Sequence, residues 1–365
     1  MAGITTTTEI SAPVNVVYQT ALLRRAQMVL PYFVGSVPGD LREHQGSFTV
    51  KWRRYEHLTP TTTALTELTG SVAFPTRTAV QPSITDVTAT VSKYGQFIFL
   101  SEEADLVNIN NVAMELSEVL GEQAGRSLNR LQRNEIEDNF TSSFTSSATT
   151  ATGVAGGSTA SGFIKLTAIA NVVNTLDRND ARKFLPMTLG STNIGSAPVR
   201  ESYWGITHPD VVADLRTLTG WNNVETYAGQ TETAIGEVGH VGGVRFVETS
   251  EASIDATTGV AATGSATTHG RSTATRYDVY MTPIFGQNAV GTVGLGFQHV
   301  KDIYRAGDNV PGVMMISHAK GSGGVADPLN EVATLGWKSW HAPKVLNSTW
   351  GRTLKTAASI LQSNE

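Results

Sequence analysis

The sequence contains no cysteine, and this absence excludes a disulfide framework, a thiolate metal site and a cysteine nucleophile. Charged residues make up only 16% of the 365 residues, below the ~25% that is usual in globular proteins. The 27 basic residues are outnumbered by 32 acidic ones, and the formal charge of −5 gives no sign of an extended basic surface that would bind nucleic acid. No apolar run approaches the ~18–20 residues of a membrane span, and Met1–Ser11 lacks the basic and apolar regions of a signal peptide.

Small and uncharged polar residues take the place of charge, with 47 threonines, 28 serines and 35 glycines. Threonine is β-branched and suits a pleated surface, whereas serine and glycine favour turns. This composition therefore predicts many strands and loops. The hydrophobic fraction of 40% still permits a sizeable core.

The N-terminal part of the chain combines a short helix with an extended ribbon. The apolar spacing predicts a helix over Val16–Val29 that ends before Pro31, preceded by a polar arm that something outside its own domain would order. Residues alternate between apolar and polar over Phe48–Arg53 and Val87–Ser92, which is the period of a β-strand. Between them, Thr59–Ser83 would form the tip of a long two-stranded ribbon. Because an isolated hairpin is marginal in water, we expect this ribbon to lie on another subunit.

The strongest helical pattern runs over Asn108–Phe144. Apolar residues recur every three or four positions, and two ion pairs, Glu122/Arg126 and Arg133/Glu137, stand four residues apart on the opposite face. At ~1.5 Å per residue this helix would be about 55 Å long. That exceeds a small domain, so the helix is expected to act as a strut.

Two tracts consist almost entirely of alanine, glycine, serine and threonine. Thr141–Gly162 is interpreted as a flexible linker or a frayed helix end, and Glu251–Thr275 as an exposed insertion that cannot supply a core. The chain after Tyr277 is predicted to form short β segments separated by glycine and proline. The region between the tracts is predicted to contain helices over Leu166–Leu176 and Asp210–Leu218, and strands over Tyr203–Thr207 and Val244–Val247.

No enzymatic constellation is present, and no catalytic, cofactor or metal residue is predicted. The glycines of Gly291–Gly296 have the reverse of the dinucleotide-binding spacing and are interpreted as structural. His208-Pro209-Asp210 is better explained by Asp210 as an N-cap or first-turn acid of a helix than by acid–base catalysis. The run Gly236–Gly243 could cradle an anion, but no helix pattern follows it, so a tight strand connection is preferred. The eight histidines are scattered, none at metal-ligand spacing.

One basic segment carries interleaved aromatics, which is the local appearance of a nucleic-acid contact. Glu56 and the acidic background dilute it, and on an extended ribbon the same residues suit a contact between subunits equally well. Two consecutive acids before the long helix favour the positive end of the helix dipole. The predicted inter-subunit contact residues are Lys51, Trp52, Arg53, Arg54, Tyr55, Glu102 and Glu103.

The order of these elements resembles the major capsid protein of tailed bacteriophages, whose fold is named after phage Hong Kong 97. Short segments spread over nearly the whole chain resemble in particular the family typified by the major capsid protein of the coliphage named N-four. These segments are Val50–Tyr55 with Leu58–Pro60, Tyr94–Ile98, Leu120–Ala124, His208–Val211, Gly242–Thr249, Asp327–Leu329, Leu335–Lys338 and Val345–Asn347.

The resemblance implies an α+β capsid fold divided into recognisable parts. These are an N-terminal arm (1–38), an extended β loop that laps over a neighbour (39–96), a peripheral domain with a spine helix (97–162), an axial α/β domain (163–324, with the insertion 251–275) and a return to the peripheral domain (325–365). It also implies a homo-oligomer of pentamers and hexamers that forms an icosahedral shell around double-stranded DNA. Expected partners are a separate scaffolding protein, a portal at one vertex, a possible decoration protein and non-specifically bound DNA, with assembly in the host bacterial cytoplasm and no membrane.

Two further expectations and three alternatives accompany this resemblance. Only about fifteen residues precede the first predicted helix, so no N-terminal cleavage is expected. Nothing pairs Lys51 with Asn330, so the shell is expected to be non-covalent. The nearest alternative is an encapsulin-like nanocompartment with the same fold, and more distant ones are a hydrolase using His208 and Asp210 and a threonine-rich secreted adhesin. The hydrolase would need a nucleophile and an oxyanion site that the sequence does not show, and the adhesin a signal peptide.

Overall fold

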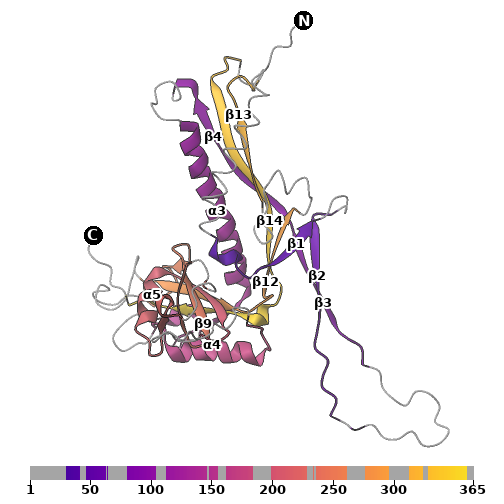
Figure 1. The fold of residues 1–365 in the computed structure, drawn as a ribbon, viewed down its shortest axis with the longest axis vertical. Coiled ribbons are helices and arrows are strands. Elements are labelled where there is room, and N and C mark those ends of the chain that lie inside the picture. Colours follow the sequence, from indigo (N-terminus) through magenta and orange to yellow (C-terminus); the bar gives the residue numbers. More distant parts are fainter. Residues whose placement is uncertain are drawn as a thin grey trace, which may run out of the picture.

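The computed structural model describes residues 30–41, 47–62, 64, 80–103, 112–145, 148–154, 162–183, 199–227, 233, 236–260, 276–295, 312–323 and 328–359. The helix expected over Val16–Val29, most of the ribbon tip and residues 261–275 lie outside these ranges. The described residues form a long arm, a compact body and a ribbon that projects away from both (Figure 1). Among them, no helix is long and apolar enough to cross a membrane.

The long arm consists of helix α3 (Val112–Asn139) and a five-stranded sheet. Its strands are β1 (Val37–Leu41), β4 (Ser92–Ser101), β12 (Val290–Leu295), β13 (Val313–His318) and β14 (Val332–Val345). Strand β14 lies between β13 and β4 and is antiparallel to both. One face of this sheet packs against α3, where Leu120, Ala124 and Leu128 meet Met315, Leu335 and Trp337. The Trp337 indole N–H donates to Gln123 Oε1 at 3.2 Å and fixes the register of the helix on the sheet.

The compact body is built on an eight-stranded sheet in the order β5-β15-β11-β6-β9-β8-β7, with β10 paired to β11. Its strands are β5 (Thr141–Phe144), β6 (Tyr203–Thr207), β7 (Asn222–Asn223), β8 (Glu237–Val241), β9 (Val244–Glu248), β10 (Ile254–Asp255), β11 (Val279–Phe285) and β15 (Gly351–Thr356). Short 3₁₀ turns are η1 (Pro31–Phe33), η2 (Ala151–Gly153), η3 (Val224–Thr226) and η5 (Ser348–Trp350).

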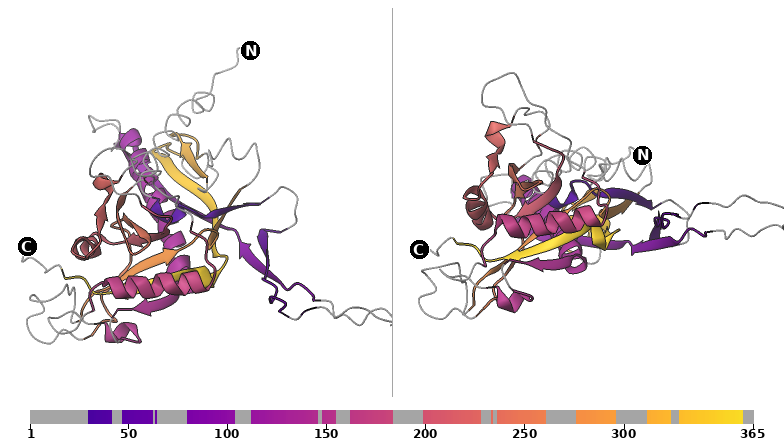
Figure 2. Two further views of the ribbon diagram at one scale, coloured as in Figure 1. Left: turned by 60° about the horizontal axis from the view of Figure 1, so that its bottom comes forward. Right: turned by 90° about the horizontal axis from the view of Figure 1, so that it is seen from below.

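Both faces of this sheet are covered, which is why β6 is buried along its whole length. Helices α4 (Leu166–Arg178) and α5 (Pro209–Arg216) supply the apolar core on one face (Figure 2). The C-terminal end of α3 covers the other face through Ile136 and Phe140. Gly351 is required at this contact, because an added Cβ would come within 2.2 Å of the Phe140 ring. Helix α3 therefore belongs to the long arm and to the compact body, and it joins them.

The ribbon is the antiparallel pair β2 (Thr49–Tyr55) and β3 (Ile84–Thr90), as the alternating pattern predicted. The predicted elements of the compact body are also confirmed, as α4, β6, α5 and β9. The run Gly236–Gly243 contains strand β8, and only its last two residues, Gly242 and Gly243, form the expected tight connection to β9, both with positive φ. The two predicted ion pairs on α3 are present, at 3.9 Å for Glu122–Arg126 and 3.8 Å for Arg133–Glu137.

The prediction of one helix through Phe144 is wrong at its C-terminal end. Helix α3 ends at Asn139, whose side-chain amide donates to the Glu135 carbonyl at 2.9 Å, and Thr141–Phe144 forms β5 alongside β15. The 28 residues of α3 span about 42 Å, and residues 108–111, which the prediction also included, lie outside the described part of the chain. Threonine and serine favour the strand here because β15 offers a ladder of hydrogen bonds that the helical pattern could not reveal. The linker interpretation fails at the same place, since Thr145 is buried and its hydroxyl donates to the Gly162 carbonyl.

The interpretation of Glu251–Thr275 as an exposed insertion is wrong for its first ten residues. Glu251 and Ala252 are buried, Ile254–Asp255 forms β10, and the Val260 N–H donates to the Val154 carbonyl at 3.0 Å. The composition of the tract could not reveal that Glu251 has charged partners on α3. Residues 261–275 lie outside the described part of the chain.

The chain after Tyr277 does not consist only of short strands, because β14 extends over 14 residues. Strands β12 and β13 fall within the range expected for the axial domain but pair with β14 of the long arm. Strand β15 falls within the range expected to return to the peripheral domain, but it lies in the sheet of the compact body. The limits of the five expected parts remain a prediction.

Candidate subunit interface

The inner face of the ribbon attaches it to its own subunit. Trp52 packs with Leu41 and Val293 at the base of the ribbon, over Gly39 of β1, where an added Cβ would come within 2.5 Å of the indole ring. Arg54 donates to the Leu346 carbonyl at 3.2 Å. Two of the five predicted contact residues on β2, Trp52 and Arg54, are therefore used within the subunit.

The other three residues, Lys51, Arg53 and Tyr55, alternate with these and face outward. Arg53 forms a two-point ion pair with Asp86 directly across the ribbon, at 2.9 and 3.2 Å. Hydrogen bonds from Arg53 lower the pKa of the Asp86 carboxyl, so the pair stays charged and mutually satisfied near neutral pH.

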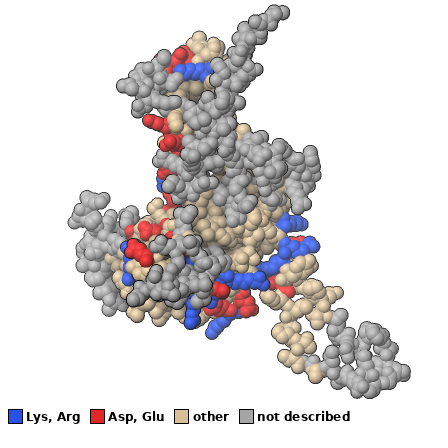
Figure 3. All heavy atoms as spheres, in the orientation of Figure 1, with Lys and Arg blue, Asp and Glu red and all other residues tan. Residues whose placement is uncertain are grey.

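The second arginine of the ribbon is neutralised as well. Arg54 donates to Glu56 Oε1 at 2.7 Å, and the Thr85 hydroxyl donates to the same oxygen at 2.7 Å. Hydrogen bonds from the Thr85 hydroxyl and, to a smaller extent, from the Arg54 guanidinium lower the pKa of the Glu56 carboxyl. Basic and acidic side chains accordingly gather together where the ribbon leaves the body (Figure 3). This pairing argues against the nucleic-acid interpretation of the segment.

Beyond its base, the ribbon exposes apolar side chains that its own subunit does not cover. Tyr55 and Ile84 face each other across the strands and are 66% and 47% exposed, while Leu58 and Val80 are 53% and 64% exposed. A soluble monomer rarely leaves such a set uncovered. These side chains therefore form a candidate interaction surface.

A second apolar surface, which the sequence reasoning missed, lies on the face of the long-arm sheet opposite α3. Phe97 and Phe99 of β4 are 60% and 66% exposed, and their rings meet edge to face at 5.1 Å. Phe97 borders a groove whose floor is Gly336, where an added Cβ would come within 2.8 Å of the Phe97 Cβ. The available signal was that apolar residues occupy both alternating positions over Phe97–Leu100, as expected of a strand covered on both faces.

The two predicted acidic contact residues follow β4 directly. Glu102 and Glu103 are exposed, and the Glu102 N–H donates to the Glu331 carbonyl at 2.9 Å. Both acids are helical, and residues 104–111, which connect them to α3, lie outside the described part of the chain. The structure does not bring them to the ribbon residues. Their role as contact residues remains a prediction.

The site considered for hydrolysis has a structural role. His208 is the N-cap of α5, and its Nδ1 accepts from the Asp210 N–H at 3.2 Å. Asp210 is a first-turn acid, as expected, and its carboxylate accepts from the Tyr280 hydroxyl at 2.6 Å. In the described part of the chain, no cluster of three or more histidine, aspartate or glutamate side chains could hold a metal ion.

Comparison with known proteins gives the family of the chain. The model of a family described as phage capsid protein matches residues 84–353. A search of curated proteins finds no match. Similar solved structures include the capsid of Ralstonia phage GP4, at 12% identity and a TM-score of 0.55, covering 92% of this chain and 93% of that one.

Two further structures are similar over comparable lengths. The head structure of Helicobacter pylori bacteriophage KHP40 has 10% identity and a TM-score of 0.52, with 91% of each chain covered. The capsid of cyanophage Pam1 has 12% identity and a TM-score of 0.50, with 89% of each chain covered. At these identities the structures show a shared mixed helix-and-sheet fold. Because the family match covers well over half of the sequence, the chain belongs to the phage capsid protein family and is a structural subunit of a virion shell rather than an enzyme.

Proposed function

We propose that this protein is the major capsid protein of a tailed phage, and that it assembles as pentamers and hexamers into an icosahedral shell around double-stranded DNA. The observation that carries the proposal is the pair of uncovered apolar surfaces, one on the ribbon around Tyr55 and Ile84 and one on β4 at Phe97 and Phe99. They are different patches on one chain. Contacts between different patches are heterologous, and such contacts close into rings when the rotation between subunits allows it.

The charge distribution supports a container that holds DNA loosely. Affinity for DNA depends on lysine and arginine side chains that release counterions from phosphates. Here the formal charge is −5, and both arginines of β2 are paired with carboxylates. We infer that contact with packaged DNA is weak and non-specific. A shell that bound DNA tightly would oppose its release.

The proposal extends to the assembly of the shell. The proposed partners are a separate scaffolding protein, a portal at one vertex and, on some shells, a decoration protein, with assembly in the cytoplasm of the host bacterium. The relation to the N-four family remains part of this proposal. Lys51 and Asn330 are both exposed, and we propose that no covalent bond joins subunits through them. A denaturing gel of purified particles should then show monomers, and a ladder of high-mass bands would contradict this.

Electron microscopy and mass spectrometry of purified particles test the function itself. We expect DNA-filled icosahedral heads in which this chain is the most abundant protein. Shells that hold protein cargo in place of DNA would indicate a nanocompartment instead. Absence of the chain from DNA-filled heads would overturn the proposal.

A further inference from the structure

One buried carboxylate connects the long arm to the compact body. Glu251 lies just after β9 and is only 4% exposed. Its Oε1 accepts from Arg126 Nε and its Oε2 from Arg130 Nε, each at 2.6 Å. Its backbone carbonyl accepts from Arg133 Nη1, also at 2.6 Å. Three arginines of α3 therefore meet at this one residue of the compact body.

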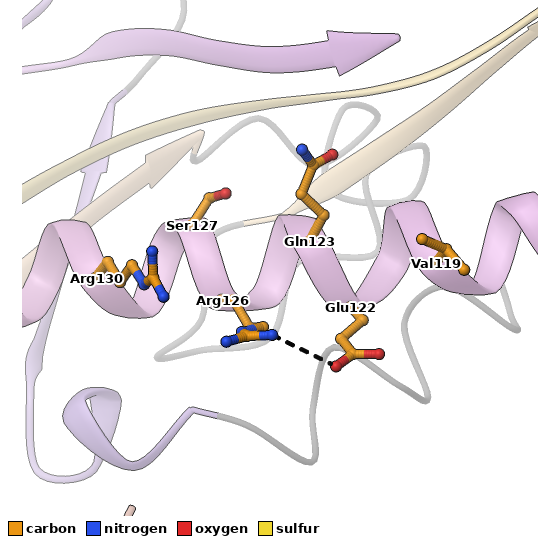
Figure 4. Close-up of a pocket in the computed structure, with 6 residues that line it drawn as sticks. All are labelled: Val119, Glu122, Gln123, Arg126, Ser127 and Arg130. Carbon is orange, nitrogen blue, oxygen red and sulfur yellow. Dashed lines mark ion pairs between the residues drawn. The ribbon is translucent and has the colours of Figure 1, made fainter. Parts of the chain in front are cut away.

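The three arginines lie on one side of α3, because residues spaced by three and four share a helix face. Figure 4 shows Arg126 and Arg130 on successive turns, with Arg126 directed along the helix toward Glu122. A groove follows the helix at this position, and its lining residues are Val119, Glu122, Gln123, Arg126, Ser127 and Arg130. The arginines are held in place by the helix, so a movement of the helix relative to β9 must break their bonds to Glu251.

Two of the attachments of helix α3 to the compact body differ in character. At its C-terminal end, Ile136 and Phe140 are buried in the apolar core with Trp204 and Phe285. Apolar contacts are non-directional and would let the helix pivot. Glu251 provides the second attachment, whose farthest arginine, Arg126, lies about 15 Å along the helix from Ile136 at ~1.5 Å per residue. Two separated attachments prevent the helix from pivoting on the compact body.

The two sides of this contact differ in solvation. The Arg126 and Arg130 side chains are 46% and 55% exposed, so water can take over from a missing carboxylate. Burial works against the charged form of Glu251, but Arg130 and Arg126 outweigh it and lower the pKa of the carboxyl. Removing the charge of Glu251 should therefore release the helix without leaving a buried, unpaired charge.

We propose that Glu251 and the three arginines Arg126, Arg130 and Arg133 form a latch that sets the angle between the long arm and the compact body. Resting on the proposed function, the same latch sets the curvature with which neighbouring subunits meet in the shell. A slip of about 2 Å at the latch, the scale of known helix shifts, turns a lever of about 15 Å by about 8°. Repeated in every subunit, a rotation of this size changes the diameter at which a shell closes.

Distance measurements between two spin labels on the full-length subunit test the latch directly. The chain has no cysteine, so labels can be placed uniquely at Glu115→Cys on α3 and Asn174→Cys on α4, both at exposed positions. Position 115 lies about 32 Å from Ile136 along the helix, so a rotation of about 8° displaces it by about 4 Å. We expect Glu251→Gln to shift or broaden the label distance by up to about that amount.

Two variants and a melting curve keep this test decisive. Arg130→Gln leaves Glu251 paired with Arg126 and should give a smaller change, and it replaces Glu251→Gln if that variant does not fold. Glu122→Gln is the matched control, because it removes a carboxylate from Arg126 without touching the compact body, and it should leave the distance unchanged. Circular dichroism and thermal unfolding establish that each variant is folded. An unchanged distance distribution in folded Glu251→Gln would overturn the latch.

The consequence for the shell has a separate readout. We expect Glu251→Gln to give shells with a broader or shifted distribution of diameters in electron micrographs, and Glu122→Gln to give normal ones. Normal diameters combined with a changed label distance would overturn the link between the latch and curvature. Failure of the unmodified chain to form shells would instead contradict the proposed function, and the distance measurement would still stand.

Discussion

Replacing Glu137 by glutamine should remove a specific pH dependence from the stability of the subunit. Glu137 is the fourth residue after Arg133 on α3, and its side chain is only 7% exposed. Burial raises the pKa of its carboxyl to about 7, opposed by Arg133 and a hydrogen bond from Ser253 and reinforced by Asp138. The ion pair with Arg133, at 3.8 Å, is too long to offset the lost hydration.

The direction of the effect follows from linkage. Between pH 4.5 and about 7 the unfolded chain has ionised this carboxyl while the folded chain still holds the proton. The folded state therefore binds more protons in this window, and its stability falls as the pH rises through it. A pKa raised from 4.5 to about 7 corresponds to a loss of about 3 kcal/mol at ~1.36 kcal/mol per unit, complete above about pH 7.

Urea unfolding of the isolated subunit, followed by tryptophan fluorescence, measures this loss. Glutamine keeps the shape of the protonated acid and does not ionise. We expect the difference in the free energy of unfolding between Glu137→Gln and the unmodified chain to grow by about 2–3 kcal/mol, in favour of the variant, as the pH rises from about 5 to about 8. Glu115→Gln is at an exposed position on the same helix, and its free energy of unfolding should depend on pH in the same way as that of the unmodified chain. If the free energies of unfolding of Glu137→Gln and the unmodified chain stay parallel over this range, the assigned cause of the pKa shift is wrong.

Three further perturbations have defined outcomes. Burial lowers the pKa of His341 to about 4, so stability should fall by up to about 3 kcal/mol as the pH drops from about 6.5 toward 4, and His341→Leu should flatten this acid limb in the same urea assay. Gly39→Val should displace Trp52, cost about 1–3 kcal/mol and expose the ribbon base to limited proteolysis. The exposed pair Phe97→Ser/Phe99→Ser should change subunit stability by less than about 1 kcal/mol yet abolish shells in electron micrographs.

Matched controls separate these effects from general damage. Val119→Ser removes an apolar side chain, 55% exposed, from α3, and it should leave shell assembly intact. Gly220→Val is a control for backbone strain, since an added Cβ there meets nothing within 4 Å but the φ of +86° is unfavourable for valine. If the double phenylalanine variant forms normal shells, β4 is not part of the interface. An unchanged proteolysis pattern in Gly39→Val would show that Trp52 does not anchor the ribbon.

Local periodicity was enough to predict several elements of this protein. The spacing of apolar residues placed the body of α3, and strict alternation placed β2 and β3, because both patterns depend only on near neighbours in the chain. The same holds for α4, β6, α5 and β9 in the compact body. The resemblance to capsid proteins also came from short segments that the sequence alone displays, and the family match bears it out.

Tertiary structure decided what each element pairs with. Helix α3 ends at Asn139 because β15 supplies a partner for Thr141–Phe144, and that partner lies more than two hundred residues away in the sequence. Val119 fits the apolar spacing of the helix yet is exposed, and Glu251 sits in a tract of small residues yet is buried against three arginines. The distinction is physical. Periodicity reports which face of an element is apolar, but only the fold brings distant residues together, and it leaves Tyr55, Phe97 and Phe99 exposed.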